Sequence, residues 1–261
     1  MKHLPNIFTL LNLFFGCIAV VLILQNGMLA TVNESGETML MLPEKIYWAS
    51  AFIGVAAIID FLDGLVARLF GYQSEMGKQL DSLADVVSFG VAPGMIIYQF
   101  LRLSFAQQPD GIDISVLWLL PSFAMPCAGA YRLARFNLDK AQTCYFKGVP
   151  IPAAGLLVAS FPLIYWYSRN DFATRLLLNS WFWYAVIGLV CFLMVSRLPM
   201  MSLKFKGFNF KKDFPKLILL LMAIVFGFLI KWLAVPLVFL IYVFLSLGMK
   251  QYVVGKSKKI E

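Results

Sequence analysis

Apolar residues in this chain are grouped into eight runs of about 18 residues or more, with polar segments between them. The runs lie at residues 5–25, 46–70, 79–101, 115–135, 150–168, 178–197, 214–231 and 233–250. A helix of about 20 apolar residues crosses the hydrocarbon core of a bilayer and satisfies its own backbone hydrogen bonds there. The last two runs are almost contiguous, which predicts a helical hairpin. The sequence therefore predicts an all-α integral membrane protein with about eight transmembrane helices.

The 22 Lys and Arg residues are divided unevenly between the two sides of this predicted bundle. If the amino terminus is cytoplasmic, 17 of the 22 fall in cytoplasmic segments. Because short cytoplasmic loops are enriched in Lys and Arg, this division predicts that both termini are cytoplasmic. The net charge of +8 is then explained by topology and by anionic lipids of the bilayer, and no nucleic acid is expected as a partner.

Four aspartates stand at helical spacing in and just after the second apolar run and at the start of the third. Asp60 and Asp63 form one pair, and Asp81 and Asp85 form another, so each pair lies on one face of a helix. An ionised carboxylate at membrane depth is costly unless it is paired or bound to a metal. Only two cations lie nearby in sequence, too few for a buried salt-bridge cluster. The four carboxylates therefore predict a site for divalent cations.

Small residues, rather than large ones, share these acidic faces. Gly64 and Ala67 continue the face of Asp60, and Gly77 begins the face of Asp81. Such residues leave room for a ligand to lie directly against the helix backbone. The pattern predicts a pocket between the two helices rather than a packed seam.

The string from Asp60 to Asp85 has the form D-x2-D-G-x2-A-R-x8-G-x3-D-x3-D. At every fixed position it resembles the CDP-alcohol phosphotransferase family of integral membrane enzymes. LDSLADVVSFGVAP at 80–93, RLARFN at 132–137 and GVPIP at 148–152 resemble motifs of the phosphatidylserine synthase subfamily. The resemblance covers about residues 4 to 200. It implies a six-helix catalytic core within residues 1–200, followed by a cytoplasmic loop and the helical hairpin within 201–261.

The resemblance implies transfer of the phosphatidyl group from CDP-diacylglycerol to the hydroxyl of L-serine, with phosphatidylserine and CMP as products. It implies two Mg2+ or Mn2+ ions on Asp60, Asp63, Asp81 and Asp85, with Asp85 also acting as general base. It further implies a homodimer in the inner (cytoplasmic) membrane. The distribution of Lys and Arg places the segment from Asp60 to Asp85 at the cytoplasmic face, where nucleotide substrates are found.

Nucleotide-binding residues are implied on both sides of the predicted pocket. They are Asn6, Thr9, Asp60, Gly64, Ala67, Arg68 and Gly77. Two of them have an alternative interpretation, since Asn6 can cap the first helix and Arg68 can extend to the membrane surface.

The acceptor residues are inferred from the chemistry of serine. Serine carries a carboxylate, so a cation is expected near the metals, and Arg132 and Arg135 are the available pair. Their alternative role is to anchor a cytoplasmic helix end. Ser88 is expected to help shape the acceptor pocket.

Two other functions stay open. Another member of the family would use glycerol 3-phosphate, an inositol phosphate or an amino alcohol as acceptor, and a phosphorylated acceptor would be expected to need a denser basic cluster. A cation transporter could use the carboxylates as a transport site. Transport, however, explains neither the glycine and alanine positions nor the fixed pattern of eight residues.

Overall fold

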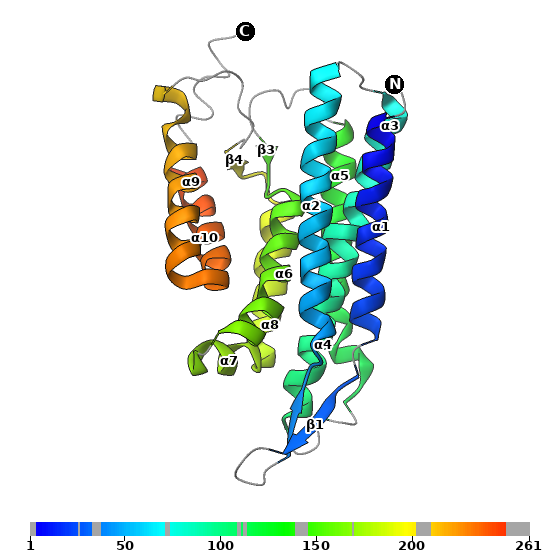
Figure 1. Cartoon of the computed structure of the whole chain (residues 1–261), viewed down its shortest axis with the longest axis vertical. Coiled ribbons are helices and arrows are strands. Elements are labelled where there is room, and N and C mark those ends of the chain that lie inside the picture. Colours follow the sequence, from blue (N-terminus) through cyan, green and yellow to red (C-terminus); the bar gives the residue numbers. More distant parts are fainter. Residues whose placement is uncertain are drawn as a thin grey trace.

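The computed structural model describes residues 4–25, 27–32, 38–70, 74–108, 111, 114–138, 146–168, 170–201 and 210–248. Long helices run side by side over most of this length (Figure 1). The helices are α1 Leu4–Leu24, α2 Lys45–Phe70, α3 Glu75–Asp85, α4 Ala92–Ala106, α5 Ala124–Leu138, α6 Ile151–Tyr167, α7 Asp171–Leu177, α8 Ser180–Val195, α9 Phe210–Ile230 and α10 Ala234–Gly248. Short helical turns are η1 Val86–Val91, η3 Val116–Trp118, η4 Leu120–Phe123 and η5 Lys231–Leu233.

Two small antiparallel ladders close the ends of the bundle. Strands β1 Leu29–Val32 and β2 Thr38–Met41 pair between α1 and α2. Strands β3 Phe146–Lys147 and β4 Pro199–Met200 pair at the other end (Figure 1). The prediction of an all-α membrane protein is confirmed, because these ladders are the only strands among the residues described.

The helices meet the requirements for membrane crossing to different degrees. Four helical stretches are long and apolar enough to cross: Asn6–Leu24, Lys45–Val66, Glu75–Ala106 and Lys216–Gly248. Helices α7 and α8 together, bent by 75°, would make a fifth. Each of the eight predicted runs contains a helix, but α5, α6 and α8 have only 15, 17 and 16 residues. By length and composition, the described part of the chain therefore has four or five candidate spans rather than the eight predicted.

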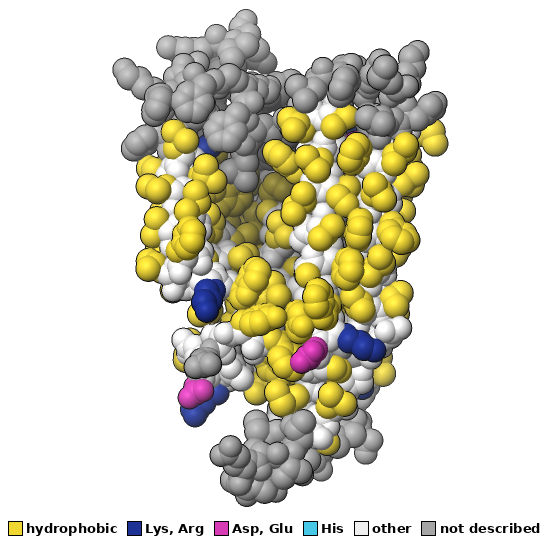
Figure 2. Space-filling model, viewed as in Figure 1, with side chains coloured by type: hydrophobic (Ala, Val, Ile, Leu, Met, Phe, Trp, Pro, Cys, Tyr) yellow, Lys and Arg dark blue, Asp and Glu magenta, His cyan; other side chains and the backbone are white. Residues whose placement is uncertain are grey.

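The surface of the bundle suits a lipid environment. Figure 2 shows hydrophobic side chains over most of the described face, with the few visible charged groups toward one end. Large apolar residues such as Phe61 and Phe228 are 64% and 87% exposed. In water such a surface would drive association, whereas lipid chains solvate it at no cost.

The predicted hairpin is present at the end of the described chain. Helices α9 and α10 are joined by η5 and lie side by side (Figure 1). Lys231, at the start of η5, has a φ of 51°, which is uncommon for a residue with a side chain. Helix α10 also packs against α6 and β4, so the hairpin is attached to the rest of the bundle.

The helix that carries Asp85 does not continue as an α-helix. Residues Val86–Val91 form a π-helical turn, η1, which α1, α5 and α6 all contact. Within it the Ser88 hydroxyl donates a hydrogen bond to the carbonyl of Asn12 on α1 (3.0 Å). An added Cβ at Gly16 would lie 2.9 Å from the Cα of Ser88, so α1 can approach this closely only with glycine there. Such turns are often found at functional sites, and this one immediately follows the acidic cluster.

A second tight junction joins the ends of α5, α6 and α8. Gly148 has a φ of +77°, and its amide donates to the carbonyl of Leu198. An added Cβ there would lie 3.0 Å from the carbonyl oxygens of Leu193 and Ser196. Glycine is therefore required both by its backbone conformation and by the lack of space.

Candidate active site

Three of the four predicted carboxylates come together. Asp60 on α2 and Asp81 and Asp85 on α3 each offer an oxygen, and these oxygens all lie within 4.8 Å of one another. Asp85 is buried, and the other two are partly buried. Three hard oxygen ligands at this separation suit a divalent cation such as Mg2+ or Mn2+.

Asp63 lies outside this group of three. It is buried on α2, and its Oδ2 accepts a hydrogen bond from the Thr9 hydroxyl on α1 (2.8 Å). Its Oδ1 has no hydrogen-bond partner among the described residues. The prediction that Asp63 is a metal ligand is therefore untested by the distances, and it stays a prediction.

Unpaired buried oxygens are the observation that fits a cation best. Asp85 Oδ1, like Asp63 Oδ1, has no hydrogen-bond partner within the described part of the chain. A buried polar atom without a partner costs about 1–3 kcal/mol, and more if it carries charge. A bound divalent ion would take these oxygens as ligands and remove that cost. The donor set and its burial thus fit the ions that the sequence predicted.

The start of α1 borders the acidic group, as predicted for a nucleotide-binding face. An added Cβ at Gly77 would lie 3.1 Å from the side-chain oxygen of Asn6, so α1 and α3 touch at this point. Thr9, one turn further along α1, contacts Asp63. An added Cβ at Gly64 would meet no atom of the described residues within 4 Å, so they leave space beside α2 there. The side chains of Ala67 and Arg68 lie outside the described residues.

Asn12 extends this face of α1, and the sequence analysis did not assign it a role. It is fully buried beside Asp85, yet neither atom of its side-chain amide has a geometric hydrogen-bond partner among the residues described. The signal was present in the sequence, because Asn6, Thr9 and Asn12 are spaced three residues apart. A third polar residue on the same face of an apolar helix points to the site.

The end of α5 fixes the position of α3, a contact that the sequence analysis also missed. The side-chain amide of Asn137 donates to the Ser82 hydroxyl (2.8 Å), and the Lys78 ammonium donates to the Asn137 carbonyl (3.2 Å). At the start of α3, the Ser74 hydroxyl caps the helix by accepting from the amide of Gly77. Together these bonds hold the turn of α3 that carries Asp81.

The two arginines of α5 have different surroundings. Arg132 is 5% exposed, and its Nε has no hydrogen-bond partner among the described residues. It lies close enough to Asp85 for electrostatic attraction. Arg135 instead donates to the carbonyls of Val195 and Ser196 at the end of α8 (2.8 and 3.1 Å). The structure therefore brings Arg132 to the acidic group and engages Arg135 as a cap on α8.

The third predicted acceptor residue, Ser88, is fully buried in η1. Its hydroxyl is already used in the hydrogen bond to the carbonyl of Asn12. It lies three residues after Asp85 in the chain. Its contact with an acceptor stays a prediction.

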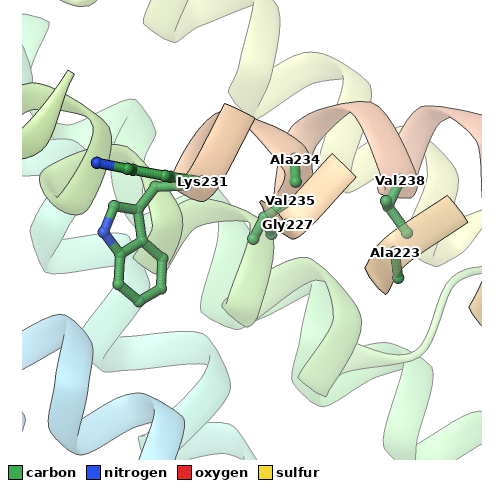
Figure 3. A pocket seen from close by; sticks show the side chains of 7 residues that line it. Ala223, Gly227, Lys231, Ala234, Val235 and Val238 are labelled. Atoms are coloured by element: carbon green, nitrogen blue, oxygen red, sulfur yellow. The ribbon is translucent and has the colours of Figure 1, made fainter. Parts of the chain in front are cut away.

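A pocket of about 540 Å3 lies away from these residues. It is lined by Ala223, Gly227, Lys231, Trp232, Ala234, Val235 and Val238 of the hairpin (Figure 3). The pocket surrounds η5, at the opposite end of α10 from β4 (Figure 1). It contains no carboxylate and is almost entirely apolar, so we do not assign it to the active site.

The sequence is similar to one protein family and to several named proteins. The CDP-alcohol phosphatidyltransferase family matches residues 2–195. The chain is 31% identical over 169 residues to CDP-diacylglycerol--serine O-phosphatidyltransferase of Bacillus subtilis, covering 62% of this chain and 77% of the relative. It is 35% identical over 159 residues to the Mycobacterium leprae protein of the same name, with 58% and 48% covered. The Helicobacter pylori strain J99 protein, also of that name, is 36% identical over 156 residues, with 59% and 54% covered. The matched region thus spans only about half the length of the last two relatives.

Proposed function

Because the chain belongs to the CDP-alcohol phosphatidyltransferase family, we propose that it transfers the phosphatidyl group of CDP-diacylglycerol to the hydroxyl of L-serine. Phosphatidylserine and CMP are the products. The observation that supports this most strongly is the group of Asp60, Asp81 and Asp85, with Arg132 buried beside it. The carboxylates suit the metal-dependent donor, and Arg132, the one buried cation among the described residues, suits a small acceptor with one carboxylate.

In this proposal the four aspartates hold two divalent cations, Mg2+ or Mn2+. When bound, the ions polarise the phosphorus under attack and neutralise charge on the departing nucleotide. Asn6 and Thr9 offer hydrogen bonds to the nucleotide, and Gly64 lets it approach α2. The space beside Gly77 is taken by the side chains of Asn6 and Ser74, so Gly77 serves the contact between α1 and α3. Arg68 is assigned to a phosphate of the donor on the resemblance alone.

Asp85 is the proposed general base. One oxygen of its carboxylate would bind a cation, and the other would accept the proton of the serine hydroxyl. The serine oxygen then bonds to the phosphorus of the phosphatidyl group, and the phosphorus–oxygen bond to CMP breaks. Arg132 pairs with the serine carboxylate and holds the hydroxyl near Asp85, with Ser88 shaping the same pocket. Arg135 contributes by fixing the end of α5 against α8.

The acceptor is tested by offering purified protein and CDP-diacylglycerol three alcohols: L-serine, glycerol 3-phosphate and inositol. We expect CMP release with serine to be at least about tenfold faster than with the others. Inositol has no anionic group to pair with the buried Arg132, and the phosphate dianion of glycerol 3-phosphate would need a denser basic cluster. A reaction without acceptor measures background hydrolysis. Faster transfer to glycerol 3-phosphate would contradict the serine assignment, and absence of CMP release with every acceptor would contradict transferase function altogether.

We also propose that the acidic end of the bundle faces the cytoplasm, in the inner membrane, with both termini on that side. Helix α1 begins and α10 ends at the end of the bundle that carries α3 (Figure 1), in agreement with the distribution of Lys and Arg. A reporter enzyme that works only in the cytoplasm should be active when it is fused to the carboxyl terminus. A fusion to residue 34, between α1 and α2, is the matched control and should report the external side. The opposite pair of signals would reverse the orientation. The homodimer implied by the family resemblance stays a prediction.

A further inference from the structure

The pocket of the carboxyl-terminal hairpin lies outside the part of the chain that matches the family, which ends at residue 195. Its volume of about 540 Å3 falls within the range of about 300–1,000 Å3 that is usual for ligand sites. Gly227 on α9 leaves it open, because an added Cβ there would meet no described atom within 4 Å. The hairpin therefore has room for a ligand beside its turn, η5.

One end of this pocket is cationic and the rest of it is aliphatic. In Figure 3 the side chain of Lys231 extends away from Ala223 and Val238, which line the opposite end. Lys231 lies eight residues after Ala223, which corresponds to about 12 Å along a helix. The described lining contains no carboxylate, so the pocket itself offers no counter-ion to the ammonium. A complementary ligand has an anionic group at one end and an apolar chain at the other.

The lysine of this turn has an uncommon backbone conformation. Its φ of 51° lies in the left-handed region, which glycine adopts without strain. The turn by itself therefore does not explain a lysine, whereas a contact made by the ammonium does. Trp232, the next residue, is 43% exposed and adds an indole of the kind that lies at the level of lipid headgroups. A cation and an indole at the end of a membrane hairpin suit a phospholipid headgroup.

We propose that this pocket binds one anionic phospholipid, with the phosphate on Lys231 and one acyl chain between Ala223 and Val238. Lipid chains are as apolar as the pocket lining, so chain contacts alone give little preference over the surrounding bilayer. The preference comes from the headgroup. A headgroup with net negative charge complements the ammonium better than phosphatidylcholine, whose choline already balances its phosphate. The site is separate from the acidic group at the α3 end of the bundle, and it does not depend on the proposed transfer to serine.

The first test measures lipid binding by the purified whole chain in detergent. Native mass spectrometry is used with dioleoylphosphatidylglycerol and dioleoylphosphatidylcholine as probes. We expect the wild type to bind phosphatidylglycerol with a Kd at least about fivefold lower than that for phosphatidylcholine. Lys231→Gln should remove most of this difference, and Lys231→Arg should keep it.

Lys45→Gln is the matched control for the charge. Lys45 begins α2 next to the β1–β2 ladder, and its ammonium already donates to the side-chain oxygen of Gln25 (3.5 Å). It does not line the pocket. We therefore expect this variant to bind both lipids within about twofold of the wild-type Kd.

A second pair of variants tests the position of the acyl chain. Gly227→Leu places a side chain inside the pocket, and we expect the Kd for phosphatidylglycerol to rise at least about fivefold. Gly188→Leu, on α8, is the control. An added Cβ at Gly188 also meets no described atom within 4 Å, but Gly188 does not line the pocket. That variant should bind phosphatidylglycerol as the wild type does.

Each of four results would overturn the proposal. Equal affinity of the wild type for the two lipids would show that the headgroup is not recognised. Unchanged binding by Lys231→Gln would exclude the ammonium, and unchanged binding by Gly227→Leu would place the acyl chain elsewhere. The same spectra report the oligomeric state. A change from dimer to monomer in Gly227→Leu, with lipid binding unaltered, would assign the pocket to a second copy of the chain.

Discussion

Asp81→Ala should reduce serine-dependent CMP release by about 10³-fold or more, and chelation with EDTA should do the same to the wild-type protein. The carboxylate of Asp81 is one of three whose oxygens lie within 4.8 Å of one another, and alanine offers no oxygen to replace it as a ligand. Metal ions in such sites contribute several kcal/mol to transition-state stabilisation, and each ~1.4 kcal/mol is a factor of ten in rate. Addition of Mg2+ or Mn2+ should restore the chelated wild type but not the variant.

A control separates this effect from a general loss of negative charge. Asp171→Ala removes a carboxylate from α7, at the other end of the bundle, and should retain wild-type turnover. Binding of Mn2+ to the substrate-free protein, followed by its paramagnetic resonance signal, gives a readout independent of activity and should be weakened only by Asp81→Ala. Full activity of the wild type in EDTA would exclude the metal-assisted mechanism.

Apolar runs in the sequence predicted helices, and the spacing of the aspartates predicted that four carboxylates converge; three of the four do so. Apolar runs specify where helices form in a membrane because the backbone must hydrogen-bond to itself there. Asp81 and Asp85 are four residues apart, so they share one face of their helix whichever helix packs against it. The positions of the helices and the shared face of Asp81 and Asp85 depend on local sequence alone. Asp60 lies beside these two carboxylates, as expected.

Features that depend on contacts between distant helices could not be predicted in this way. The π-helical turn after Asp85 lies where α1 approaches closely at Gly16, more than 60 residues earlier in the chain. Arg132 and Arg135 look equivalent in sequence, but only Arg135 lies beside the last carbonyls of α8. The contact of α10 with the end of β4 depends on residues 41 positions apart, since the Tyr242 hydroxyl donates to the carbonyl of Met201. Packing between elements, rather than periodicity, decides each of these.

Asp85 is proposed both as a metal ligand and as a general base, and one substitution distinguishes the two roles. Asp85→Asn keeps the size of the side chain and one oxygen for a metal, but it removes the proton acceptor and the charge. Since a positioned base contributes about 10²–10⁴-fold, we expect turnover to fall by that factor. Binding of CDP-diacylglycerol should be partly retained, because Asp60, Asp63 and Asp81 still offer three carboxylates to the ions.

Two measurements together separate the two roles. Turnover reports proton transfer, whereas binding of Mn2+ and of the CDP-diacylglycerol donor reports the ligand set. Loss of turnover with binding retained would assign the base to Asp85. Near-normal turnover would assign the base to another residue. Loss of turnover together with loss of metal and nucleotide binding would instead show that Asp85 acts first as a ligand, since three carboxylates would then be too few to hold the ions.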